Sequence, residues 1–460
     1  MEGVSFGTDG WRTTREDFTR ARIRAVGQAV ATFLTDEGLD APVGICYDSR
    51  EGSRAAAEEL ARVCCANGYD VRLADRDRPT PCLAHAIVER GLSGGLMVTA
   101  SHNPPEYNGI KFIPSTGAPA LPQVTDAIAE RLAPPAPLPA SDHGRIGEVD
   151  LAGPHADACL DRLDVDLSGL TVAYDAMYGS GRDTTDALLE RAGARVQAQR
   201  TARDPTFGGT GPDPGPDTLP DLVDVVTSGA ADLGVANDGD ADRIALVTPE
   251  RGVLNGHETY AVCYQGLLTR DGERPGPAVR TVSTTALIDR IANAHGESVH
   301  EVPVGFKWVA AAMAEHDALF GGEESGGYSI RGHVREKDGV LMALLAAALH
   351  HEEPLDDRLD RLTARFGAVD QGKTSVECPE GRVAAVMDAM AETVPGEIAG
   401  TPVVDRTTMD GFKLFLEDGS WVLVRPSGTE PVIRVYAEAA TTDRVERLLD
   451  EGSTLVEGLV

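Results

Sequence analysis

Short apolar segments alternate with helix-like segments along most of the chain, and this alternation constrains the fold more than any other feature. Residues 43–47 form a compact apolar run typical of a buried strand, and residues 58–66 follow as a helix-like stretch. The same order recurs at residues 170–174 and 184–192. Strands that alternate with helices predict parallel sheets covered by helices on both faces.

Breaks in this alternation divide the chain. The prolines between residues 134 and 139 cannot continue a helix and predict a stiff, extended segment. After about residue 368 the pattern changes to strands around a tight loop, at residues 421–424 and 432–438. The length of 460 residues suits three or four domains of about 100–150 residues each. We predict three α/β domains and a smaller α+β domain, with the boundaries 1–150, 151–255, 256–370 and 371–460.

Charge and composition exclude several classes of protein. The net charge of −31 argues against nucleic-acid binding, which needs a basic surface, and against adhesion to anionic membranes. No apolar run reaches the roughly 18 residues of a membrane span, and the first residues do not resemble a signal peptide. The seven cysteines show no metal-ligand spacing. They read as reduced thiols, which predicts a cytoplasmic protein.

The first candidate site is the segment Thr99-Ala100-Ser101-His102-Asn103-Pro104-Pro105. It follows an apolar strand, so Ser101 is expected at the carboxyl end of that strand, where open α/β sheets bind ligands. An ordinary Ser/Asn/Pro turn and a hydrolase serine are the alternatives. No Gly-x-Ser-x-Gly motif surrounds Ser101. His102 is the next residue, and adjacent side chains pointing in opposite directions make it a poor base for Ser101.

The second candidate is the acidic segment Asp238-Gly239-Asp240-Ala241-Asp242-Arg243, which lies between two apolar strands. If the segment is extended, its three carboxylates point the same way. Such oxygen ligands suit Mg²⁺, which completes its shell with phosphate and water. Acidic residues are so frequent in this chain that about two such triplets are expected by chance. The metal-site prediction therefore depends largely on the position of the triplet between two apolar strands.

Two glycine-rich segments follow. In Gly321-Gly322-Glu323-Glu324-Ser325-Gly326-Gly327, Glu323 and Ser325 could bind neighbouring sugar hydroxyls, although an acidic turn explains the same residues. The other segment runs from Arg425 through Pro426, Ser427, Gly428, Thr429 and Glu430 to Pro431. Its guanidinium, hydroxyls and glycine-containing backbone could bind a phosphate, and Arg434 could add a second guanidinium. An ordinary loop that connects two strands explains the same residues equally well.

Positive charge gathers in the same segments. Against a charge of −31, an anionic substrate needs a local basic pocket, and the chain has only five lysines. Three of them, Lys111, Lys307 and Lys337, fall in motif-like or glycine-rich stretches. Lys307 follows Gly305, and Arg12 follows the Gly/Asp turn at residues 7–10. Retaining lysine there indicates a need for a point charge or a titrating amine.

Taken in order, these segments resemble the motifs of the α-D-phosphohexomutase superfamily, and the resemblance covers nearly the whole chain. The segment at Ser101 resembles its phosphoserine loop, and the segment at Asp238–Asp242 resembles its metal loop. The segment at Glu323 resembles its sugar-specificity loop, and the one at Arg425 resembles its phosphate-binding loop. The resemblance implies three related α/β mixed-sheet domains and a smaller C-terminal α+β domain around a central cleft.

The resemblance also implies site residues. Ser101 would carry a phosphoryl group, and one Mg²⁺ would be bound by Asp238, Asp240, Asp242 and a phosphoserine oxygen. The expected catalytic residues are Ser101, Lys111, Arg243, His102 and Arg12. Lys111 is the expected general acid/base, its proton affinity lowered by neighbouring cations. The expected substrate-binding residues are Glu323, Ser325, Gly305, Lys307, Arg425, Ser427, Gly428, Thr429 and Arg434.

The implied reaction is reversible phosphoryl transfer between O1 and O6 of a hexose phosphate, with a hexose 1,6-bisphosphate as intermediate and activator. Glu324 and Gly327 favour glucose phosphates, because glucosamine-phosphate mutases tend to have Gln and His there. A phosphomannomutase or an enzyme of dual specificity stays open, and a phosphoglucosamine mutase is the weaker alternative. Outside the family, the alternatives are a Mg²⁺-dependent sugar phosphatase and a non-catalytic sugar-phosphate sensor. The expected partners are small hexose phosphates, with the chain as a monomer or homodimer.

The acidic, lysine-poor composition also suggests a salt-rich cytoplasm, because salt screens the repulsion between like charges. We therefore expect the unfolding midpoint to rise in molar salt. Thermal unfolding at increasing salt concentration measures this, and a midpoint that does not rise would contradict the interpretation.

Overall fold

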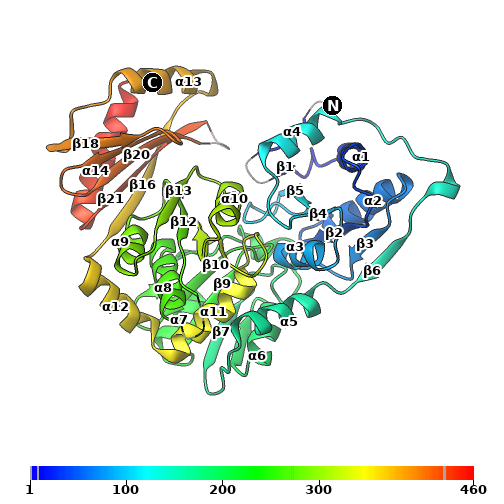
Figure 1. The fold of residues 1–460 in the computed structure, drawn as a ribbon, viewed down its shortest axis with the longest axis horizontal. Coiled ribbons are helices and arrows are strands. Elements are labelled where there is room, and N and C mark those ends of the chain that lie inside the picture. Colours follow the sequence, from blue (N-terminus) through cyan, green and yellow to red (C-terminus); the bar gives the residue numbers. More distant parts are fainter. Residues whose placement is uncertain (1–2, 8–9, 271, 273, 428–430) are drawn as a thin grey trace.

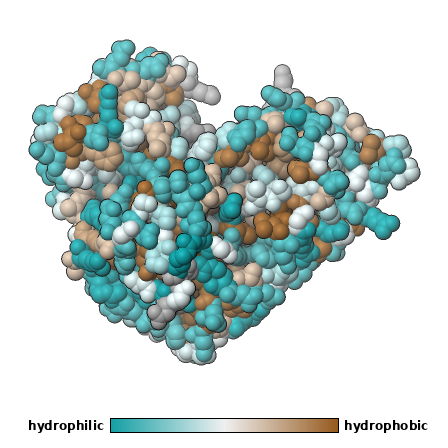
Figure 2. Space-filling view, in the orientation of Figure 1, coloured by the Kyte–Doolittle hydropathy of each residue, from teal (hydrophilic) through white to brown (hydrophobic). Residues whose placement is uncertain are grey.

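The computed structural model describes residues 3–7, 10–270, 272, 274–427 and 431–460. Four sheets follow one another along the chain, and Figure 1 shows them arranged as a heart-like body. In the space-filling view, a notch separates the upper lobe that contains the C-terminal sheet from the lobe that contains the N-terminal sheet (Figure 2). None of the helices in the described residues is long and apolar enough to cross a membrane.

The first sheet has the strand order β1-β5-β4-β2-β3-β6. Its inner strands are buried on both faces, so alternate residues of β2 point into different cores, Ile45 into one and Cys46 into the other. Its strands are β1 (Trp11–Thr14), β2 (Val43–Tyr47), β3 (Val71–Ala74), β4 (Gly94–Val98), β5 (Tyr107–Pro114) and β6 (Ile146–Val149). Its helices are α1 (Arg20–Asp36), α2 (Ser53–Ala66), α3 (Thr80–Glu89) and α4 (Pro122–Glu130).

The second sheet has the order β11-β10-β9-β7-β8, and the third has the order β13-β12-β14-β15. The second contains β7 (Thr171–Asp175), β8 (Arg195–Gln199), β9 (Leu233–Asn237), β10 (Ile244–Thr248) and β11 (Gly252–Val253), with α5 (Ala152–Leu163), α6 (Thr185–Arg191) and α7 (Pro220–Thr227). The third contains β12 (Ala278–Thr281), β13 (Val299–Val302), β14 (Phe320–Gly322) and β15 (Tyr328–Ile330), with α8 (Gly256–Thr269), α9 (Leu287–Ala294), α10 (Phe306–His316), α11 (Gly339–Glu352) and α12 (Leu355–Phe366).

The sheets of the first three domains are mixed rather than purely parallel, as the family resemblance implies. The alternation of strands and helices alone predicts parallel sheets, and this prediction fails where two strands are joined without a helix. Strands β9 and β10 pair antiparallel across the short acidic loop, and β4 and β5 pair antiparallel across the serine loop. Both connections are too short for the crossover that parallel neighbours require. Each candidate loop therefore joins two antiparallel neighbours.

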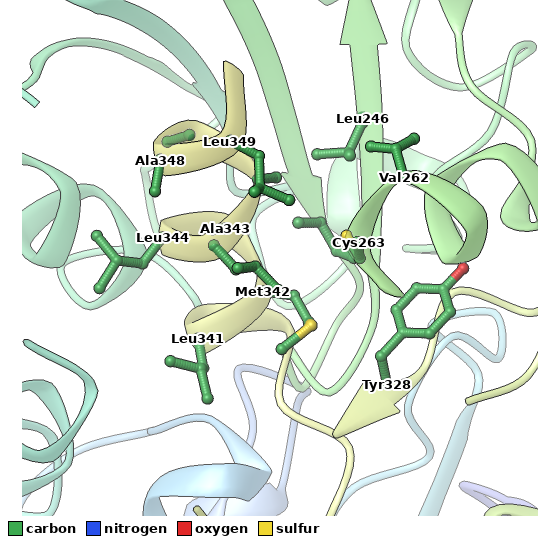
Figure 3. Packing of buried hydrophobic residues seen from close by; sticks show 14 of the residues in the cluster. Leu246, Val262, Cys263, Tyr328, Leu341, Met342, Ala343, Leu344, Ala348 and Leu349 are labelled. Atoms are coloured by element: carbon green, nitrogen blue, oxygen red, sulfur yellow. The ribbon is translucent and has the colours of Figure 1, made fainter. Parts of the chain in front are cut away.

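The second and third domains share one hydrophobic core. Helix α11 is buried on every side from Gly339 to His350, which is expected of a helix that is apolar all round. Figure 3 shows Met342 and Leu349 on this helix pointing toward side chains of β10, α8 and β15, whereas Leu341 and Leu344 point away from them. The core therefore runs through the boundary predicted near residue 255, and that boundary stays a prediction.

The last sheet is entirely antiparallel, with the order β16-β21-β20-β19-β18-β17. Helices α13 (Val383–Glu392) and α14 (Thr442–Glu457) cover one face. On the other face Trp421 and Leu423 pack against Val282 of the third domain. The strands are β16 (Asp370–Glu377), β17 (Glu397–Ile398), β18 (Thr401–Thr407), β19 (Phe412–Leu416), β20 (Trp421–Pro426) and β21 (Val432–Ala439).

Candidate active site

Ser101 lies directly against the acidic loop. It follows β4, is fully buried, and has a φ of 52°, a conformation that side chains other than glycine rarely adopt. Its backbone N–H donates to Thr99 Oγ1 at 2.8 Å, and its own Oγ donates to Asp238 Oδ2 at 2.8 Å. A serine of the first domain thus contacts a carboxylate 137 residues further along the chain.

The three aspartates converge, but not in the way assumed from sequence. The segment between β9 and β10 is a tight turn with Ala241 at a φ of 52°, so the premise of an extended segment was wrong. The turn still brings oxygens of Asp238, Asp240 and Asp242 within 4.8 Å of one another, all fully buried. The backbone N–H of Arg243 donates to Asp238 Oδ1 at 3.2 Å and helps to close the turn.

This carboxylate cluster fits a divalent cation. Burial, followed by the charges of Asp240 and Asp242, raises the pKa of Asp238 well above its usual range. Asp242 Oδ1 is buried, and among the described residues no hydrogen-bond donor reaches it. Three desolvated carboxylates at this separation repel one another unless a cation is shared between them. Oxygen ligands of this kind are those that Mg²⁺ prefers.

Cations from two other domains meet the same carboxylates. Lys111 on β5 places Nζ 3.1 Å from Asp240 Oδ2 and 3.1 Å from Asp242 Oδ2. Lys337, which precedes α11, places Nζ 2.8 Å from Asp242 Oδ2. The general-acid/base prediction for Lys111 rests on neighbouring cations. Lys337 is one such cation, since both ammonium groups contact Asp242 Oδ2, although the closest charged partners of Lys111 are carboxylates. Lys337 was noticed in the sequence only as a lysine in a glycine-rich stretch.

His102 lies closer to the serine than its sequence position suggests. Its Nδ1 is 3.4 Å from Ser101 Oγ. Adjacent side chains point in opposite directions only in an extended backbone, and the left-handed conformation of Ser101 breaks that alternation. The nearby charge of Arg243, together with burial and Arg12, lowers the pKa of His102 far below its usual range. The imidazole is therefore neutral at ordinary pH, and the same charges make it a weak base.

Arg50 organises the serine loop and was missed as a site residue. Its guanidinium is fully buried and donates to the carbonyl oxygens of Ser101 at 2.5 Å, Asn103 at 2.6 Å and Pro104 at 2.7 Å. Its Nε donates to Asp48 Oδ2 at 3.0 Å. One side chain thereby satisfies carbonyls that a turn would otherwise leave buried without donors. The sequence signal was an Asp-Ser-Arg directly after a buried strand.

Two further contacts fix the first domain against the acidic loop. Thr80 at the start of α3 donates from Oγ1 to Asp240 Oδ2 at 2.7 Å, a contact with no signal in the sequence. Arg12 on β1 donates from Nη1 to Asn103 Oδ1 at 2.9 Å, which brings this arginine to the serine loop. Gly109 allows this close packing, because a Cβ there would lie 2.3 Å from Trp11 O.

The segment around Glu323 joins the same site. The N–H of Ile244, next to Arg243, donates to the carbonyl of Gly326 at 3.0 Å, which ties this segment to the acidic loop. Glu323 Oε1 accepts from the N–H of Gly305 at 2.9 Å, and Ser325 is exposed. Burial, followed by the charge of Glu324, raises the pKa of Glu323 to about 7.

Glu324 has a different role from Glu323. Its Oε2 accepts from Thr284 Oγ1 at 3.1 Å and from Thr281 Oγ1 at 3.3 Å, so it anchors the segment to β12 and the turn that follows. Lys307 lies in the first turn of α10, with Nζ 5.9 Å from the centre of the Trp308 ring. Of the predicted sugar-binding residues, Glu323 and Gly305 are in direct contact.

The C-terminal domain contributes a pair of arginines. Arg425 on β20 and Arg434 on β21 are directly opposite in the antiparallel register. Like charges at such positions repel, and an anion between them relieves the repulsion. Arg425 Nε donates to Asp410 Oδ2 at 3.1 Å, and the same oxygen accepts from the N–H of Val304 at 2.9 Å. Asp410, which was also missed, therefore joins the arginine to the segment before Gly305.

Two predicted phosphate-binding residues, Gly428 and Thr429, lie outside the described residues. Ser427 is described, and its N–H donates to Val432 O at 2.9 Å across the end of the β20–β21 pair.

Comparison with known proteins gives the same picture over the full length. Models of the four phosphoglucomutase/phosphomannomutase domains match residues 3–135 (alpha/beta/alpha domain I), 154–252 (domain II), 255–366 (domain III) and 374–453 (the C-terminal domain). A "Probable phosphoglucosamine mutase" of Methanopyrus kandleri is 33% identical, with 100% of this chain and 99% of that protein covered. A "Phosphoglucomutase/phosphomannomutase" of Thermococcus kodakarensis is 32% identical, with 99% of each covered.

A solved structure also matches the whole chain. A protein of Thermus thermophilus, described as a candidate phosphomannomutase, superposes with a TM-score of 0.85 at 30% identity, covering 99% of each chain.

The buried position of Arg50 leads to a stability prediction. Replacing Arg50 by Gln leaves Asp48 buried without its cation, so we expect the free energy of unfolding to fall by about 3–5 kcal/mol. The matched control is Arg54→Gln, which breaks an exposed pair with Glu58 and should cost at most about 1 kcal/mol. Denaturant unfolding of the two variants beside the parent chain measures both. Equal, small losses would show that Arg50 does not hold the loop.

Proposed function

Because the chain belongs to the phosphoglucomutase/phosphomannomutase family, and is therefore a phosphohexomutase, we propose that it interconverts glucose 1-phosphate and glucose 6-phosphate through a phosphorylated Ser101. The observation that carries this proposal is the 2.8 Å contact between Ser101 Oγ and Asp238 Oδ2. It places a serine oxygen beside three carboxylates and two lysines in one buried site. Phosphoryl transfer needs such a combination of a metal-binding carboxylate group and cations beside the oxygen that carries the phosphoryl group.

In the first step, the bond between the phosphorus and Ser101 Oγ breaks as a bond to the free hydroxyl of the hexose phosphate forms. The hydroxyl proton passes to a base, for which we propose Lys111, and Ser101 Oγ, the leaving oxygen, takes up a proton, so that the serine ends the step as a hydroxyl. Mg²⁺, held by Asp238, Asp240 and Asp242, would offset the negative charge of the transferring group. Arg12 and Arg243 flank the serine loop and the acidic loop, where their charges act on the same group.

In the second step, the hexose bisphosphate has turned around, and its other phosphoryl group returns to Ser101 Oγ. In this step Ser101 Oγ gives up its proton, and the sugar oxygen that releases the phosphoryl group takes one up. His102 lies 3.4 Å from Oγ and can orient the hydroxyl, but its lowered pKa makes it a weak base. The group that is not being transferred would be bound by Arg425 and Arg434, with Ser427, Gly428 and Thr429. Because both ends of the sugar use the same two places, one site serves both directions.

The sugar-binding residues would be Glu323, Ser325, Gly305 and Lys307. Preference for glucose over glucosamine rests on Glu324 and Gly327. A Cβ at residue 327 would lie 2.5 Å from Lys337 Cδ, so the histidine typical of glucosamine-phosphate mutases would displace the lysine that contacts Asp242. The names of relatives such as the Methanopyrus kandleri protein favour glucosamine phosphate instead. Mannose phosphate or dual specificity is the remaining alternative, and a comparison of substrates decides among them.

The central prediction concerns Ser101→Ala. We expect it to bind hexose phosphate but to lose at least about 10³-fold in kcat, because the phosphoryl carrier is gone. The matched control is Ser49→Ala, because Ser49 is also buried and its Oγ has no hydrogen-bond partner among the described residues. Isomer formation is followed by phosphorus NMR with Mg²⁺, with and without a hexose 1,6-bisphosphate activator.

In the same assay, glucose, mannose and glucosamine phosphates are compared, and glucose phosphate is expected to give the highest kcat/KM. Near-normal turnover by Ser101→Ala would refute the phosphoserine. Release of free phosphate without isomer formation would indicate the phosphatase, and binding without any turnover would indicate a sensor.

The raised pKa of Glu323 leads to a second prediction. The carboxyl is protonated below about pH 7, whereas accepting hydrogen bonds from sugar hydroxyls requires the carboxylate. Substrate affinity should therefore rise with pH up to about 7 and level off above it, beyond the change due to the phosphate itself. Calorimetric titration of the parent chain and Glu323→Gln measures this difference. The exposed Glu315→Gln should behave as the parent, and identical profiles for all three would contradict the role of Glu323.

A further inference from the structure

A second group of metal-ligand side chains lies outside the active site. His155 and Cys159 are one helical turn apart on α5, His333 follows β15, and Asp338 precedes α11. One ligand atom from each lies within 4.8 Å of all the others. His155 Nε2 is 2.6 Å from Asp338 Oδ2, His333 Nε2 is 2.8 Å from the same oxygen, and Cys159 Sγ is 3.6 Å from His155 Nε2. The cysteine spacing in the sequence gave no sign of this group, because its members come from two distant segments, α5 and the loop between β15 and α11.

The group is closed off from water. His155, Cys159 and Asp338 are fully buried, and the His333 side chain is only 3% exposed. Without an ion, one carboxylate oxygen accepts from two imidazoles, which requires an ionised acid in the protein interior. A buried ionised group of this kind is costly unless the surrounding charges offset it.

The chemistry of the four ligands selects the ion. One thiolate, two imidazoles and one carboxylate form a four-ligand set of the kind that encloses Zn²⁺ in tetrahedral sites. The three aspartates of the active site offer only oxygen, which suits Mg²⁺. The two groups therefore differ in the class of metal they bind, although Asp338 is adjacent to Lys337 of the active site.

We propose that His155, Cys159, His333 and Asp338 bind one Zn²⁺ ion, separate from the Mg²⁺ site, that joins α5 to the segment leading into α11. Metal-binding carboxylates are usually oriented by a further hydrogen bond. Asp338 has such a bond, since its other oxygen, Oδ1, accepts from the N–H of Leu341 at 2.8 Å. Helix α5 packs against both α3 and α11 (Figure 1). A surface pocket lined by His85 and His333 gives the ion a route from solvent.

Zinc in this place would also restrain the active site. The backbone that carries Asp338 carries Lys337, whose Nζ contacts Asp242. Fixing Asp338 fixes the start of α11 and with it the base of the Lys337 side chain. The ion would act by position and would not touch the substrate.

The test uses the full-length chain with Co²⁺ in place of zinc. A tetrahedral site with a thiolate gives a sulfur-to-cobalt charge-transfer band in the near ultraviolet and intense visible bands, whereas an oxygen-only Mg²⁺ site gives neither. We expect these bands at one Co²⁺ per chain in excess Mg²⁺, and metal analysis of the purified protein should find one zinc. A protein with no zinc and no charge-transfer band would overturn the proposal and leave a hydrogen-bonded His–Asp–His network.

Two buried cysteines provide matched variants. Cys159→Ser should lose the charge-transfer band, and His333→Gln should lower the metal content. Cys263→Ser should keep both, because Cys263 is buried on α8 and is not one of the four ligands. A band that survives Cys159→Ser and disappears in Cys263→Ser would contradict the ligand assignment. Because the spectrum of the parent chain is decisive alone, the test stands even where a variant fails to fold.

Discussion

The attraction between three buried carboxylates and the cations around them is the interaction on which the active site depends. Asp238, Asp240 and Asp242 come from one short turn of the second domain. Lys111 reaches them from the first domain and Lys337 from the third. Such a concentration of charge without water is stable only when each domain keeps its place. The site and the packing of the three domains are therefore one property of the molecule.

Much of this arrangement could be predicted from the sequence. The strands flanking each loop are local features of apolar pattern, so β2, β7, β9 and β10 were found within a residue or two of their bounds. The order of the four motifs indicated the family, and Ser101 does meet Asp238. These successes rest on patterns that lie within a few neighbouring residues.

What could not be predicted depends on distant contacts. Arg50 and Asp410 each hold a loop that lies far from them in the sequence. Arg50 follows a buried strand, but that position does not indicate which loop its guanidinium binds. The carboxylates of the acidic loop converge through the left-handed conformation of Ala241. The alternation of side chains along an extended strand, from which we predicted the convergence, does not predict such a turn. His102 approaches Ser101 for a similar reason, because one unusual φ changes where the next side chain points.

The burial of α11 on every side has a consequence for how the gene can be altered. A protein assembled from independent modules can lose or exchange one of them, but this helix is covered jointly by β10 of the second domain and α8 of the third. A chain ending after the second domain would leave Leu246 and its neighbours without their covering, and the third domain alone would expose Leu344 to water. Evolution and engineering must therefore treat the two middle domains as one inherited unit, whereas the C-terminal sheet has a core of its own.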